Sequence, residues 1–226
     1  MTLETRAILK SVLLLAMLAA MLFVPAGTLR FWQAWVFLAV VAGATSFPLF
    51  YLMRRDPGLL ARRMQTKEKS SEQRLFKILF VPLWVSAVSV PGLDRRLGWS
   101  RDLLGGVPLW LTVLAEAVVI GGYVLLFAVL KANTFAAATI RVEAGQKVIS
   151  DGPYRCVRHP MYSAILLMVL ATPLALGSYI AVPLTVLIVP VLVYRLANEE
   201  KVLLRELPGY AEYCRRTRYR LAPWVY

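Results

Sequence analysis

The polar segment Ser150–Tyr162 (Ser-Asp-Gly-Pro-Tyr-Arg-Cys-Val-Arg-His-Pro-Met-Tyr) contains the side chains best suited to chemistry in this chain of 226 residues. The segment contains the only histidine of the chain, His159, which stands between Arg158 and Pro160. Histidine can donate or accept a proton near neutral pH, and arginine can bind a carboxylate. Proline is typical of the first turn of a helix, whose free N–H groups favour an anion. The segment therefore predicts an anion-binding turn that leads into a helix.

The elements that must position this segment are hydrophobic and long. The chain is 59% hydrophobic with a mean hydropathy of +0.62, and its apolar residues come in blocks. About 20 apolar residues in a helix cross the ~30 Å hydrocarbon core of a bilayer. We expect an all-α fold, a polytopic transmembrane helical bundle with about six spans, or five, and a cytosolic C-terminal helix. The expected spans cover residues 7–24, 31–53, 75–92, 108–130, 160–176 and 179–197.

The loops between these spans differ in charge. If the N-terminus lies in the cytoplasm, 22 of the 26 Lys and Arg residues fall on the cytoplasmic side. An asymmetry of this kind indicates orientation, so we expect an integral membrane protein with both termini cytoplasmic. The net charge of +13 would then face anionic membrane lipids rather than nucleic acid. With one histidine and two distant cysteines, no metal site is expected.

The basic residues and the spans suggest two parts. Residues 1–106 are expected to form N-terminal membrane helices and a basic cytosolic loop. Residues 107–226 are expected to form the core that carries the site and an amphipathic helix at 199–218, broken or bent at Pro208-Gly209. Within span 108–130, Glu116 is costly to bury unless it is paired. It is either a substrate contact or a hydrogen-bonding partner of a neighbouring helix.

Only Gly177 and Ser178 separate the last two spans, which predicts an antiparallel helical hairpin. The hairpin would bring the Ser150–Tyr162 segment to the same membrane face as Glu199 and Glu200, which follow the last span. The site would then offer both a cationic and an anionic pole. A ligand with a carboxylate and a positive centre fits it, and S-adenosyl-L-methionine is such a ligand. Two alternatives involve no ligand. Glu199 and Glu200 would be a solvated helix start, and Arg158-His159 would be an anchor at the membrane interface.

The pattern Gly152–Tyr162, a helical hairpin, Glu199-Glu200 and Tyr210-x-x-Tyr213 resembles the isoprenylcysteine carboxyl methyltransferase family of integral membrane enzymes. Phospholipid methyltransferases share much of it. The resemblance covers roughly residues 120–226. It implies S-adenosyl-L-methionine as cofactor and methylation of a lipophilic small molecule or lipid from the cytosolic side.

The resemblance also assigns roles to residues. Arg195, one helical turn before Glu199, would hold and polarise the substrate, so Arg195 and His159 are the expected catalytic residues. Arg195 and Glu116 are the expected substrate contacts. Together with Arg158 from the charge argument, the expected cofactor-binding residues are Thr139, Gln146, Lys147, Val148, Ile149, Tyr154, Arg158, His159, Pro160, Met161, Tyr162 and Glu199.

The methyl acceptor stays open. In the family, a Phe-Gly pair comes three residues before the first of the two C-terminal tyrosines. This chain has Leu207-Pro-Gly209 instead, with a spacing one residue shorter. The difference bears on the position of the C-terminal helix and on the substrate pocket. We expect carboxyl methylation of an isoprenoid-type substrate. The alternatives are a phospholipid N-methyltransferase, an NADPH-dependent membrane reductase of sterol or isoprenoid double bonds, and a scaffold or small transporter without catalysis.

Overall fold

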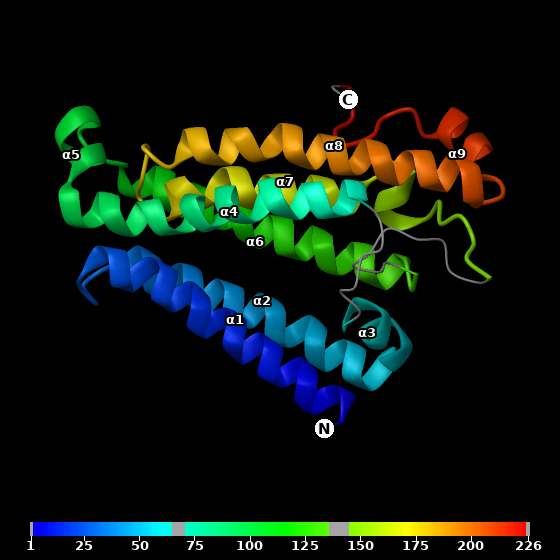
Figure 1. Ribbon diagram of the computed structural model, residues 1–226, viewed down its shortest axis with the longest axis horizontal. Coiled ribbons are helices and arrows are strands. Elements are labelled where there is room, and N and C mark those ends of the chain that lie inside the picture. Colours follow the sequence, from blue (N-terminus) through cyan, green and yellow to red (C-terminus); the bar gives the residue numbers. More distant parts are fainter. Residues whose placement is uncertain (1, 65–70, 136–144, 225–226) are drawn as a thin grey trace.

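The computed structural model describes residues 2–64, 71–135 and 145–224. Over these residues the protein is a bundle of long helices that run side by side, without a strand (Figure 1). The elements are α1 (Leu3–Ala26), α2 (Trp32–Arg55), α3 (Pro57–Met64), α4 (Ser71–Leu97), α5 (Trp99–Leu104), α6 (Leu109–Ala132), the 3-10 helix η1 (Gly152–Arg155), α7 (Pro160–Ala175), α8 (Val182–Glu206) and α9 (Tyr210–Arg216). The predicted all-α polytopic bundle is confirmed.

Five of the described helices are long and apolar enough to cross a membrane: α1, α2, α4 from Arg74 onward, α6 and α8. The sixth apolar helix, α7, has 16 residues and measures about 24 Å at the helical rise. It is shorter than a typical span, yet it runs between the end of α6 and the start of α8, which lie at opposite ends of the bundle (Figure 1). The chain is therefore an integral membrane protein. Its described part has five candidate spans, or six if α7 is counted, and these are the two numbers that the hydropathy pattern predicts.

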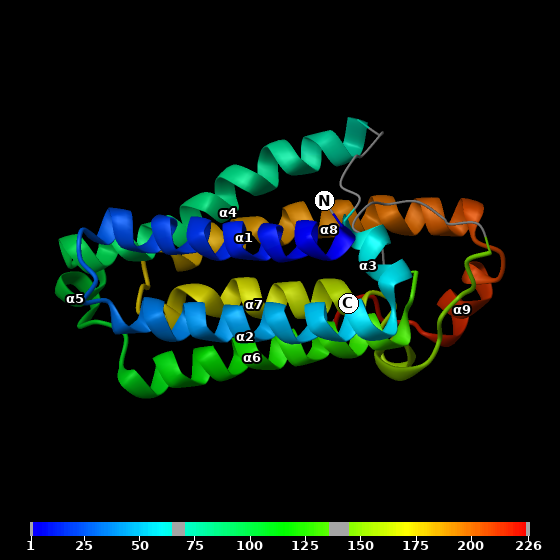
Figure 2. The same ribbon diagram turned by 90° about the horizontal axis from the view of Figure 1, so that it is seen from below.

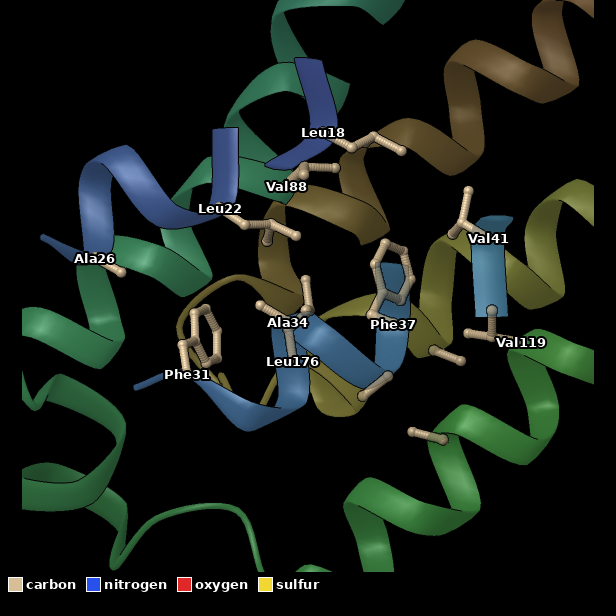
Figure 3. Close-up of a cluster of buried hydrophobic side chains, with 13 residues drawn as sticks. Leu18, Leu22, Ala26, Phe31, Ala34, Phe37, Val41, Val88, Val119 and Leu176 are labelled. Atoms are coloured by element: carbon tan, nitrogen blue, oxygen red, sulfur yellow. The ribbon is translucent and has the colours of Figure 1, made fainter. Parts of the chain in front are cut away.

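A cluster of buried apolar side chains holds the N-terminal helices to the rest of the bundle (Figure 3). Leu22 of α1, Phe37 of α2 and Val88 of α4 meet Val119 of α6 and Leu176, which follows α7. Most other apolar side chains of these helices face outward, where lipid replaces water as their surroundings. The core thus joins helices from both sides of residue 106.

Several boundaries differ from the predicted ones. Helix α8 continues without a break to Glu206, so only residues 210–216 form a separate C-terminal helix, after the predicted interruption at Pro208-Gly209. The connection between α7 and α8 spans residues 176–181 and is longer than the predicted turn. Hydropathy could not locate these ends because helix ends are set by local hydrogen bonds, not by apolar content.

Buried hydrogen bonds fix the connection between α7 and α8. Ser178 donates its hydroxyl to the Asp94 carboxylate at 2.5 Å, and the Ser100 backbone N–H donates to the same carboxylate at 2.7 Å. The backbone N–H of Tyr179 donates to the Ser100 hydroxyl at 2.8 Å. This cluster of Asp94, Ser100 and Ser178 joins the α4–α5 corner to the α7–α8 connection at one end of the bundle.

The opposite end of the bundle collects the basic segments. The start of α1, helix α3, the end of α6, η1 and α9 all lie there (Figures 1 and 2). The predicted asymmetry between the two ends is therefore a feature of the fold. The loop predicted as a basic connection after α2 contains α3, whose buried Leu59 and Leu60 pack toward α1 and α2.

Close packing of α1 on α4 depends on Gly92. A Cβ placed on Gly92 would collide with the carbonyl oxygen of Leu22 and lie 3.2 Å from the backbone nitrogen of Ala26. Both atoms belong to the α1 backbone and cannot rotate away. Small residues commonly allow such close contacts between membrane helices.

We predict that Gly92→Ala lowers the free energy of unfolding by about 1–3 kcal/mol, because the added methyl group overpacks a backbone contact. Thermal unfolding of the detergent-solubilised protein measures the effect. Gly43→Ala in α2 is the matched control, since nothing lies within 4 Å of a Cβ there. Equal melting temperatures for the two variants would contradict the proposed contact.

Candidate active site

A pocket with an empty volume of about 890 Å³ opens at the basic end of the bundle. The segment 145–150, η1, the start of α7, the end of α8 and α9 form its walls. Its lining residues are Asn133, Phe135, Gln146, Lys147, Val148, Ile149, Tyr154, Arg158, His159, Pro160, Met161, Tyr162, Arg195, Glu199, Val202, Leu203, Leu207, Tyr210 and Tyr213.

Every predicted cofactor-binding residue that the structure describes lines this pocket, and so does Arg195. Thr139 lies outside the described residues. Gln146 and Glu199 are more than fifty positions apart in the chain, yet both face the same space because α7 and α8 run antiparallel between them. The predicted juxtaposition of the two ends of the hairpin is thus what the fold shows.

One wall of the pocket joins α7 to α8 through a phenol and a carboxylate. Tyr162 donates its hydroxyl to the Glu199 carboxylate at 2.6 Å, and the charge of Arg195 also acts on this hydroxyl. The guanidinium carbon of Arg195 lies 4.5 Å from the centre of the Phe76 ring of α4, a cation–π distance. Arg195 and Glu199 are one helical turn apart, so both present their polar groups to the same side of α8.

Behind His159 lies a buried carboxylate with two arginine partners. Glu200 pairs with Arg158 at 3.2 Å and with Arg220 at 2.8 Å, and only 6% of its side chain is exposed. The His159 Nε2 atom is 3.8 Å from the same carboxylate and 3.4 Å from the Tyr210 hydroxyl. The charge of Arg158 is therefore partly neutralised by Glu200, so Arg158 is not fully available to bind a ligand carboxylate.

Helix α9 covers the pocket with two tyrosines. Tyr213 donates to the backbone carbonyl of Tyr154 at 2.8 Å, and Asn133 donates from its side-chain amide to the Tyr154 hydroxyl at 2.9 Å. Burial raises the pKa of Tyr154 to about 12, which the Asn133 hydrogen bond partly opposes. Burial likewise raises the pKa of Tyr213 and of Tyr210 above its usual value. All three phenols are therefore neutral at physiological pH.

The residues after α9 return to the start of α7 and fix it. The backbone N–H groups of Arg158 and His159 donate to the carbonyls of Tyr219 and Arg220, each at 2.9 Å. The Ser163 hydroxyl donates to the carbonyl of Leu221 at 2.5 Å. We call residues 217–221 the C-terminal strap. It holds the His-Pro turn in place, and its Arg220 also pairs with Glu200.

Glu116 does not line the pocket. It is buried within α6, and neither carboxylate oxygen has a hydrogen-bond partner among the residues that the structure describes. The predicted hydrogen bond to a neighbouring helix is thus not found there, and its role as a substrate contact stays a prediction.

Sequence reasoning gave no role to several lining residues. Val202 and Leu203 stand three and four positions after Glu199, and this helical spacing could have placed them on the same face. Tyr210 and Tyr213 were part of the recognised pattern but had no assigned contact. The lining residues from α6 and the segment that follows it, Asn133 and Phe135, carry no sequence signal of their own.

Residues 112–205 match the model of the Isoprenylcysteine carboxyl methyltransferase (ICMT) family. The matched segment, which is less than half of the chain, is similar to this family. The segment extends from α6 to the end of α8 and contains His159, Arg195 and Glu199. The match therefore includes most of the residues that line the pocket, while α1, α2 and α4 lie outside it.

A curated relative shares part of this region. The chain is 31% identical over 134 residues to the Delta(14)-sterol reductase TM7SF2 of Mus musculus. The match covers 54% of this chain and 32% of the relative, so the chain spans about a third of the length of that protein. Among the residues that the structure describes, no group of three or more His, Cys, Asp and Glu side chains could hold a metal ion.

We predict that Glu200→Gln destabilises the protein by about 2–3 kcal/mol, because two arginines lose the charge of a buried partner. The strap should loosen at the same time, which faster trypsin cleavage within residues 216–220 would show. Glu206→Gln removes an exposed pair with Arg205 and should change the stability by less than ~0.5 kcal/mol. A Glu200 variant as stable and as protease-resistant as the Glu206 variant would disprove the anchoring role.

Proposed function

We propose that this protein is an S-adenosyl-L-methionine-dependent methyltransferase of the membrane that acts on a lipophilic acceptor. Carboxyl methylation of an isoprenoid-type substrate is the reaction that we favour. The observation that carries the proposal is the position of Tyr162, Arg195 and Glu199 together in a pocket of an ICMT-family segment.

The residues of the pocket suit this cofactor. Glu199 offers a carboxylate for an ammonium group, and Lys147 with the start of α7 offers positive charge for a carboxylate. Apolar and aromatic side chains such as Val148, Leu203 and Tyr210 complete the wall. When bound, S-adenosyl-L-methionine supplies an electrophilic methyl group.

The chain's own residues would act by binding and orientation. A carboxylate acceptor is already a nucleophile and has no proton to lose, so the site requires no strong base. Arg195 would hold the acceptor carboxylate, with its guanidinium plane supported by Phe76 and its charge near Tyr162. Fixing two reactants in an aligned geometry contributes several kcal/mol to a displacement reaction. His159 would position the cofactor side, since Tyr210 and Glu200 hold its ring.

We assign the basic end of the bundle to the cytoplasm, which places the pocket and both termini there. The assignment rests on the positive-inside rule and on the common location of the basic segments at this end. The cofactor, which is water-soluble, would then enter from the cytosol. The acceptor would reach Arg195 from the membrane, since α8 is a candidate span.

Reduction with NADPH is the second candidate, because the mouse relative is by name a sterol reductase. The pocket supports it less well. A dinucleotide with several phosphates requires a set of cations, whereas Arg158 is paired with Glu200 and Arg195 is engaged by Phe76 and Tyr162. A phospholipid amine as acceptor would leave the cofactor assignment unchanged.

We predict that Arg195→Ala lowers kcat by about 10²–10³-fold, as expected when a group that orients and polarises the substrate is lost. Turnover is measured with labelled S-adenosyl-L-methionine and a lipid extract, and the labelled product identifies the acceptor. Arg205→Ala, an exposed arginine on the same helix, should stay within about twofold of the parent. Equal rates for both variants would remove Arg195 from catalysis.

We predict that Glu199→Gln raises the Kd for S-adenosyl-L-methionine roughly 10–100-fold, because a charge-assisted hydrogen bond is lost. Isothermal titration of the purified protein gives the Kd, and a parallel titration with NADPH tests the second candidate. Glu206→Gln is again the control. Binding of NADPH without binding of S-adenosyl-L-methionine would overturn the proposed function.

A further inference from the structure

A second cavity lies among the N-terminal helices, with an empty volume of about 860 Å³. Residues of α1, α2, α3 and α6 line it, and we call it the apolar cavity. Helices α1 and α6 both pack on α2, which runs between them (Figure 2), but make little contact with each other. None of its lining residues belongs to the cofactor pocket.

The lining is almost entirely apolar. Three of its residues carry hydroxyl groups, and Tyr123 is one of them. The other two bond to their own helices: Ser11 donates to the carbonyl of Ala7 at 3.1 Å, and Thr45 donates to the carbonyl of Val41 at 2.8 Å. They therefore present little free polarity to the cavity. An apolar space of this kind inside a membrane protein does not attract water. If it is empty, the side chains of its walls lack van der Waals contacts on the side that faces it.

Two cations mark the end of the apolar cavity that faces the basic side of the bundle. Lys10 of α1 donates to the backbone carbonyl of Met64 at 3.4 Å, and Arg63 precedes Met64 in α3. No carboxylate is found among the described residues that line the cavity. Lys10 and Arg63 thus place two positive charges at one end of the apolar cavity, where they can attract an anionic headgroup.

We infer that the apolar cavity binds a membrane phospholipid with an anionic headgroup. Its acyl chain fills the space between α1, α2 and α6, and its phosphate lies against Lys10 and Arg63. The apolar walls and the two cations at one end match the two parts of such a lipid, and the location within membrane-spanning helices supplies it by lateral diffusion.

The lipid at this site is distinct from the methyl acceptor. Arg195 and Glu199 belong to α8, which contributes nothing to the apolar cavity. A head group held by Lys10 and Arg63 would therefore lie outside the pocket that contains the proposed catalytic residues. The inference does not depend on the proposed function, because it concerns lipid binding alone.

Helix α3 connects the two sites. Arg62 donates to the backbone carbonyl of Thr134 at 2.5 Å and lies 5.8 Å from the centre of the Phe135 ring, which lines the cofactor pocket. The neighbouring Arg63 lines the apolar cavity and interacts electrostatically with Tyr154. An anionic lipid that orders α3 would thereby order one wall of the cofactor pocket.

The test uses the full-length protein in phosphatidylcholine nanodiscs doped with phosphatidylglycerol that carries a diazirine in its acyl chain. Photolabelling followed by peptide mass spectrometry should mark peptides of α1, α2 and α6. Ala44→Phe fills the cavity and should abolish this labelling, whereas Ser46→Phe adds the same bulk on an exposed position of α2 and should not. Labelling that Ala44→Phe leaves unchanged would overturn the inference.

The charges are tested separately, which keeps the inference testable if Ala44→Phe does not fold. Arg63→Gln should weaken phosphatidylglycerol labelling about fivefold, the equivalent of ~1 kcal/mol, while Arg55→Gln, an exposed arginine at the same end, should leave it unchanged. Diazirine-labelled phosphatidylcholine should label these peptides less than phosphatidylglycerol does. Equal labelling by both lipids, or displacement of the label by the methyl acceptor, would disprove an anionic-lipid site distinct from the acceptor site.

Discussion

The buried carboxylate of Glu200 is the interaction on which the arrangement of the pocket depends. It binds Arg158 at the start of α7 and Arg220 in the C-terminal strap, and it approaches the ring of His159. A carboxylate inside a protein is stable only when cations and hydrogen bonds compensate the loss of water. Because Glu200 lies on α8 and its partners come from the His-Pro turn and the strap, meeting this requirement brings these three segments to one place.

The residues of the pocket could be predicted because two independent constraints agree. Hydropathy predicts that the last two apolar segments are antiparallel, and the polar residues at their ends then lie together. The pattern around His159 supplied the identity of those residues, and every described member of the predicted cofactor set, from Gln146 to Glu199, lines the pocket. The all-α type and the five or six long apolar helices followed from composition for the same reason: a bilayer leaves a spanning chain few alternatives.

What could not be predicted rests on backbone contacts and on burial. The strap reaches Arg158 and His159 through carbonyls of Tyr219 and Arg220, and any residue type could provide these carbonyls. The longer connection after α7 depends on a hydrogen bond from Ser178 to a distant carboxylate, Asp94. Neither contact has a signature in local composition. Glu116 is the opposite case. As an acid within a predicted span it suggested a substrate contact, but it lies apart from the pocket.

Two of the buried carboxylates, Asp94 and Glu200, stand at opposite ends of the same hairpin. Asp94 holds the connection between α7 and α8, and Glu200 holds the open ends of these helices. Sliding of α7 along α8 would break both clusters at once, so the hairpin is a fixed frame for a ligand. Gly209, with its positive φ of 82°, lies outside this frame between α8 and α9, so a change of backbone angle there would move α9 without sliding α7 along α8.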